Sequence, residues 1–152
     1  MSKWGSNRRG EGGAAVVETA LCLCFLVLPL VFATISYAYM LSFRQTVSQS
    51  AAEGARAAAV APSTATQAQR ETVAKNAVTA SLHTGVGSLS CTDPRVTCTV
   101  ETVDNCGDGS SNDCMRVTVS YPYKDHSLLP SVPGMGFVLP KTISYSALAE
   151  VS

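Results

Sequence analysis

One carboxylate, Glu18, stands where a membrane helix would begin. It follows Gly13 by five residues, and the 25 residues after it, 19–43, carry no charge. As an α-helix this apolar run is roughly 37 Å long, which exceeds a hydrocarbon core of about 30 Å. A carboxylate at the edge of such a segment is costly unless it has a partner. Cutting the chain after Gly13 would supply one, because it creates an amine on Ala14, one helical turn from Glu18.

The leader in front of the apolar run is basic. Lys3, Arg8 and Arg9 stand against Glu11, so the positive-inside rule predicts a cytoplasmic N-terminus and places the remainder outside. Secretory signal peptides have an apolar core of about 7–15 residues. The longer run and its acidic start therefore argue against a signal peptide, and an uncleaved membrane anchor is the stronger alternative.

Six cysteines fall into two groups. Cys22 and Cys24 lie in the apolar run, where we interpret them as small apolar side chains. The other four lie in the exported part, where an even number indicates disulfides: Cys91, Cys98, Cys106 and Cys114. Of the three possible pairings we favour nearest neighbours, because each closes a short turn-rich loop. Spacings of seven and eight with no nearby histidine disfavour a zinc site.

Composition and motifs argue against several functions. The net charge is zero, and no basic stripe follows the leader, which disfavours nucleic-acid binding. The sequence has no P-loop, G-x-S-x-G or H-E-x-x-H motif, and His83 and His126 are isolated. The aspartates of residues 104–114 lack EF-hand spacing, so a solvated loop is favoured over a calcium site. We predict no enzymatic activity, no cofactor and no metal.

The helix predicted from the apolar run extends beyond the membrane. Residues 44–61 are mostly good helix formers, and Pro62 ends the pattern, so we predict one helix over residues 14–61. In its lipid half, Pro29 removes a backbone hydrogen bond and predicts a kink or local melting, unless the membrane helix simply tolerates it. The outer half carries a stripe of small side chains suited to close packing on a helix or sheet: Val47, Ala51, Ala55 and Ala58.

Residues 62–152 predict an exported globular α+β domain that carries the disulfides. A second, shorter helix begins at a capping-box spacing, Thr64 and Gln67, and ends at Gly85 and Gly87.

From residue 88 onward the apolar period changes to two. The alternation covers residues 96–101, 115–121 and 142–151. It predicts an antiparallel sheet of three strands, or four if residues 88–92 pair, covered on one face by the outer half of the long helix. The apolar loop 127–140 either folds over the core or presents a contact patch to another subunit or to lipid.

The chain resembles the TadE-like pseudopilins of the tight-adherence (Tad/Flp) pilus system. The matching features are the basic leader, Gly-Ala-Ala-Val-Val-Glu at residues 13–18, and an apolar helix that holds a proline. The stretch Ser-Ala-Ala-Glu-Gly-Ala-Arg-Ala-Ala-Ala at residues 50–59 is the most specific. The C-terminal strand resembles the family more loosely, and the segment with the four exported cysteines rests on the residues alone.

The resemblance implies a pilin-like fold and cleavage of the leader, residues 1–13, by a prepilin peptidase between Gly13 and Ala14. Gly12 leaves the cut open by one residue, although the spacing to Glu18 favours Gly13. The implied role is a minor pseudopilin needed for pilus assembly and adherence. The implied partners are the prepilin peptidase, other pilins and pseudopilins, membrane platform proteins and a separate secretion ATPase. The expected location is the bacterial cytoplasmic membrane, with a single pass and incorporation into a surface pilus.

Cleavage would give Glu18 two partners in turn. In the membrane monomer the Ala14 amine would partly satisfy it, and in an assembly the amine of a neighbouring subunit would do so and set the helix register. Two alternatives stay open: a pseudopilin-like subunit of a type II secretion or DNA-uptake filament, and a single-span membrane protein with a binding ectodomain. Leader cleavage separates the pseudopilins from the ectodomain protein, and neighbouring genes separate the two kinds of pseudopilin.

Overall fold

The structure is a computed structural model that describes residues 11–107, 111–126 and 140–151 of the 152-residue chain. Most of the basic leader and residues 127–139 of the predicted apolar loop lie outside the described residues. The described chain is α+β, as predicted, with a long N-terminal helix, a second helix and a three-stranded antiparallel sheet. It divides between Ala38 and Tyr39 into two compact units.

The first unit is helical throughout its described residues. Helix α1 spans Glu11–Cys22, the π-helical turn η1 spans Leu23–Val27, and α2 spans Leu28–Ala59 and so continues into the second unit. The side chains of residues 13–32 are all exposed. Apolar surface on every side of a helix is typical of a segment that lies in lipid or among other helices.

The outer part of α2 forms one wall of the second unit. The predicted stripe of small side chains is confirmed, because Val47, Ala51, Ala55 and Ala58 are at most 1% exposed. These residues recur every three or four positions and therefore share one face of the helix. They join a core that also takes side chains from the second helix and from the sheet.

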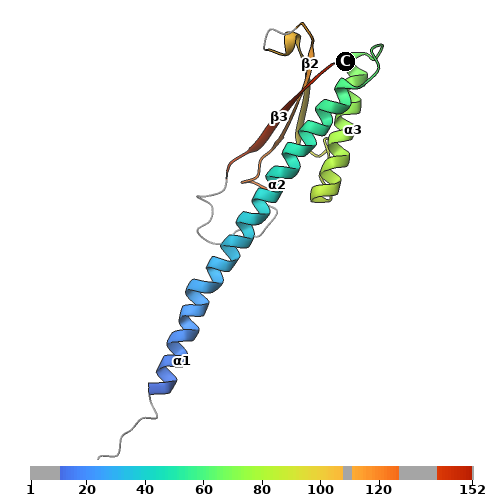
Figure 1. The fold of residues 1–152 in the computed structure, drawn as a ribbon. Coiled ribbons are helices and arrows are strands. Elements are labelled where there is room, and N and C mark those ends of the chain that lie inside the picture. Colours follow the sequence, from blue (N-terminus) through green and yellow to red (C-terminus); the bar gives the residue numbers. More distant parts are fainter. Residues whose placement is uncertain (1–10, 108–110, 127–139, 152) are drawn as a thin grey trace, which may run out of the picture. The chain divides into compact units, whose positions relative to one another are not determined.

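Helix α3 spans Gln67–Val86 and lies alongside α2 (Figure 1). Its start differs from the prediction by two residues. The Ala65 N–H donates to the Pro62 carbonyl over 2.8 Å, and this turn keeps the chain out of helical geometry for longer than expected. The capping box therefore forms between Thr66 and Gln69. The Gln69 N–H donates to the Thr66 hydroxyl, and the Thr66 N–H donates to the side-chain oxygen of Gln69.

A side chain from α3 caps the C-terminal end of α2. Arg70 is 8% exposed, and its guanidinium donates to the Ala58 carbonyl over 2.8 Å and to the Pro62 carbonyl over 3.1 Å. A cation at this position satisfies carbonyls that lack helical partners and complements the negative end of the helix dipole. Arg70 thus ties the two helices together where the chain turns between them.

The sheet has the strand order β1-β2-β3, and its strands span Thr97–Val103, Cys114–Tyr121 and Ile143–Glu150. Both pairings are antiparallel. The optional fourth strand is absent from the described residues. Residues 88–92 lead instead into a turn, in which the Asp93 N–H donates to the Ser90 carbonyl over 3.0 Å.

The side chains on one face of the central strand, β2, point into the core. Val117 lies opposite Val100 on β1 and Ala147 on β3. The predicted alternation holds along β2, where every second residue is at most 1% exposed: Met115, Val117, Val119 and Tyr121. This face packs on α2, the predicted cover.

Two disulfides join nearest neighbours in sequence. Cys91 bonds to Cys98, with Cα atoms 5.6 Å apart, and Cys106 bonds to Cys114, with Cα atoms 4.8 Å apart. The first ties the segment after α3 to the start of β1. The second closes the loop between β1 and β2, where Asn105 and Cys106 have φ values of 53° and 50°.

Candidate processing and assembly site

The residues predicted to be cut and to direct assembly lie together on α1. Gly13, Ala14 and Glu18 are all helical and all exposed. Apart from its chain neighbours and its own helix backbone, no described atom lies within 4 Å of a Cβ atom built on Gly13. The positions Ala14 and Glu18 are four residues apart, so they lie one above the other on the same face of the helix.

Glu18 has no hydrogen bond or ion pair to any residue that the structure describes. Its neighbour Thr19 is satisfied within the helix, because its hydroxyl donates to the Ala15 carbonyl over 2.8 Å. An unpaired carboxylate next to apolar side chains is unfavourable in lipid. The geometry therefore leaves Glu18 available to an amine on its own helix or on another chain.

The helix is distorted one turn before Pro29. The Leu28 N–H donates to the Leu23 carbonyl, five residues back, which is the bonding pattern of a π-helix. Proline has no N–H for the carbonyl four residues earlier, that of Phe25, and its ring crowds that carbonyl. A wider turn between Leu23 and Val27 relieves this crowding. A π-helical turn thus lies directly on the N-terminal side of Pro29, and the predicted kink or local melting there stays a prediction.

The folded domain begins inside the segment predicted to span the membrane. Met40 is 4% exposed and Phe43 is 2% exposed, and both belong to the core of the second unit. The part of the segment 19–43 that lies outside this folded unit therefore ends at Ala38. Residues 19–38 form a helix of roughly 30 Å, which still matches a hydrocarbon core of about 30 Å. Cys22 and Cys24 are exposed free thiols within it.

Within the stretch 50–59, α2 packs closely on both α3 and β2. A Cβ atom on Gly54 would lie 2.5 Å from Cγ2 of Val78 on α3 and 3.2 Å from Cγ1 of Val117 on β2. The Ser50 hydroxyl, fully buried, donates to the Thr46 carbonyl over 2.7 Å and lies 3.1 Å from the Ser81 hydroxyl on α3. The small side chains of this stretch therefore allow a helix and a sheet to pack on one helix at the same level.

Aromatic side chains gather where α2 enters the domain. The Phe43 ring lies 5.1 Å from the Tyr121 ring and 5.5 Å from the Tyr123 ring, measured between centroids. Burial raises the pKa of both tyrosines above the usual value, so both are neutral at physiological pH. The Tyr121 hydroxyl donates to the His126 carbonyl over 2.9 Å. These ring contacts attach this end of the domain to α2 at Phe43.

An ion pair holds the turn that leads into β1. The Arg95 guanidinium donates to both carboxylate oxygens of Asp93, over 2.9 and 2.6 Å. The Arg95 N–H also donates to Asp93, and together these side-chain and backbone hydrogen bonds lower the pKa of Asp93 to about 2. The pair neutralises both charges locally.

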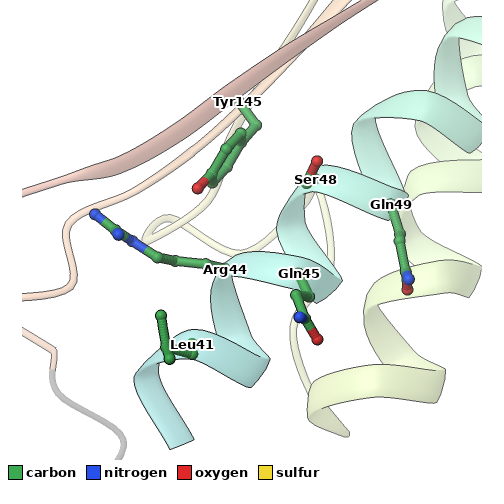
Figure 2. A pocket seen from close by; sticks show the side chains of 6 residues that line it. All are labelled: Leu41, Arg44, Gln45, Ser48, Gln49 and Tyr145. Carbon is green, nitrogen blue, oxygen red and sulfur yellow. The ribbon is translucent and has the colours of Figure 1, made fainter. Parts of the chain in front are cut away.

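An open groove of about 570 Å³ lies between α2 and β3. Figure 2 shows Arg44 and Ser48 of α2 and Tyr145 of β3 on the same side of the helix, with the remaining lining residues on α2. The Nε atom of Arg44 is buried without a hydrogen-bond partner among the described residues. Sequence reasoning missed this groove, because only folding brings Tyr145 next to Arg44.

The fold defines a class of protein, an α+β domain built on the outer half of one N-terminal helix. The described residues contain one helix that is long and apolar enough to cross a membrane, and this indicates single-pass anchoring. The family model described as TadE-like protein matches residues 13–56. The match supports a TadE-like protein of the Tad pilus system and confirms the resemblance noted above. No curated protein and no solved structure matches the chain.

Proposed function

We propose that this chain is a minor pseudopilin of a Tad-type pilus, cut by a prepilin peptidase after Gly13 and required for pilus assembly and adherence. The observation that carries the proposal is the extent of the family match, which begins at Gly13 and ends at Arg56. The match thus covers the cut site, Glu18, the apolar segment and most of the small-residue stretch on α2.

The proposed mechanism gives the N-terminal residues of this segment and the apolar residues that follow them different tasks. Cleavage creates an amine on Ala14, and in the filament that amine pairs with Glu18 of a neighbouring subunit in a medium where either charge alone is costly. The exposed apolar side chains that follow Glu18 pack against other pilins and pseudopilins. A buried pair of this kind contributes more to helix register than to stability.

The other proposed partners act from the membrane. A prepilin peptidase removes the leader, platform proteins hold the subunit in the cytoplasmic membrane, and a separate secretion ATPase supplies the energy. The N-terminus lies in the cytoplasm and the domain from Tyr39 lies outside, in keeping with the basic leader and the two disulfides.

The first test is the cut itself. Gly13→Leu should block processing, because a side chain would intrude where the peptidase approaches the backbone. Mass spectrometry of the chain from cells that contain the peptidase should then show the uncut form, larger by residues 1–13. Gly12→Leu is the matched control and should still be cut. If the wild-type chain keeps residues 1–13 in such cells, the pseudopilin proposal is wrong.

A further inference from the structure

The end of the domain where α2 enters it carries an excess of positive charge. Arg44 is the first charged residue after the apolar run. Lys124 and Lys141 are exposed and adjacent in space, because the Lys124 N–H donates to the Lys141 carbonyl over 3.2 Å. Asp125 follows Lys124 directly in the sequence, and the Asp93 carboxylate is paired with Arg95.

Two ring contacts and one strand pairing place these cations at the same end. The segment with Lys124 follows Tyr121 and Tyr123, whose rings both contact Phe43, the neighbour of Arg44. Lys141 precedes Ile143, which pairs with Tyr121 at the last position of the sheet ladder.

Arg44 also carries an unsatisfied buried donor. Its Nε atom is buried without a hydrogen-bond partner among the described residues, and a buried donor in this state is costly. The groove beside it offers two hydroxyl groups, on Ser48 and Tyr145, that could bind the same ligand (Figure 2). A guanidinium with neighbouring hydroxyls suits a phosphate group.

We propose that this end of the domain binds the phosphate headgroups of anionic phospholipids in the outer leaflet, with Arg44 as the central contact and Lys124 and Lys141 beside it. The position along the chain supports a lipid as the source of the phosphate. Arg44 follows Ala38, the last residue of the first unit, by only six residues of the same helix α2.

Lipid binding by the full chain in detergent tests the proposal. Native mass spectrometry would follow titrations with phosphatidylglycerol and with phosphatidylcholine. Each basic residue near an anionic surface contributes about 1 kcal/mol, so Arg44→Gln should weaken phosphatidylglycerol binding about fivefold and leave phosphatidylcholine binding unchanged. Because the leader is itself basic, the result is the difference between variants. Arg56→Gln, which removes an exposed charge from the same helix farther from the membrane, is the control and should change neither affinity.

The Lys124→Gln/Lys141→Gln double variant provides an independent test on other elements. It should weaken phosphatidylglycerol binding about 25-fold. Equal binding by wild type and Arg44→Gln, an equal loss in Arg56→Gln, or no loss in the double variant would overturn the proposal. So would inorganic phosphate binding as tightly as the lipid. The assay needs neither cleavage nor assembly, so its outcome is separate from that of the proposed function.

Discussion

Gly54 offers a quantitative test of how the small-residue stretch shapes the domain. Gly54→Ala has two opposing effects on the free energy of unfolding. Alanine is favoured over glycine in a helix by about 1 kcal/mol. Its Cβ atom, however, would lie 2.5 Å from the Val78 Cγ2 atom, whereas carbon atoms prefer about 3.5–4.0 Å. Val78 is fully buried, so it cannot move aside into solvent.

Overpacking of this kind costs about 1–3 kcal/mol, so Gly54→Ala should destabilise the domain by about 0–2 kcal/mol. The decisive measurement repeats the substitution in a Val78→Ala background, which removes the closest obstacle. There the helix preference should dominate, and Gly54→Ala should become neutral or stabilising. The expected coupling between the two positions is therefore about 1–2 kcal/mol.

The assay is urea unfolding of the full chain in detergent, followed by the near-ultraviolet circular dichroism of the buried tyrosines. Ala52→Gly is the matched control, because Ala52 is exposed on the same helix. It should cost about 1 kcal/mol in both backgrounds. If Gly54→Ala has the same effect with and without Val78, within about 0.5 kcal/mol, the close approach of α3 to α2 is not what requires glycine at this position.

Three further predictions concern other parts of the chain. Glu18→Val should leave membrane insertion and leader cleavage intact but remove surface pili in electron micrographs, and normal piliation would contradict the pairing mechanism. The exported domain should carry no free thiol by alkylation and mass analysis, and opening either disulfide should lower the unfolding free energy by about 2–3 kcal/mol. The lowered pKa of Asp93 means that its ion pair contributes stability above the unfolded value of 3.8, and this contribution is lost as the pH falls toward about 2. An Asp93 carboxyl that titrates identically in wild type and Arg95→Gln, measured by NMR, would refute that ion pair.

The fold was predictable wherever a local pattern repeats. The alanine stripe of α2 and the alternation along β2 each bury one face, so their periods alone indicate helix and strand. The start of α3 was wrong by two residues, because Thr64 and Thr66 both offer capping chemistry and only the turn at Pro62 decides between them. A sequence pattern cannot weigh that turn against a nearby competing cap.

The candidate site divides in the same way. Gly13, Ala14 and Glu18 are close in sequence, so their places on one helix face follow from the helical period. Contacts between distant segments did not follow. The Arg70 cap depends on how α3 meets α2, and the groove beside Arg44 depends on how β3 meets α2. The sequence pattern around each arginine indicates neither contact.

The disulfide pattern has a consequence for biogenesis. If the domain is exported as proposed, its cysteines leave the translocation channel in the order in which they pair. Cys91 meets its partner Cys98 before Cys106 emerges, and Cys106 then meets Cys114. Stepwise oxidation by thiol–disulfide exchange therefore gives the native bonds directly, and maturation of this domain should need an oxidase but no disulfide isomerase.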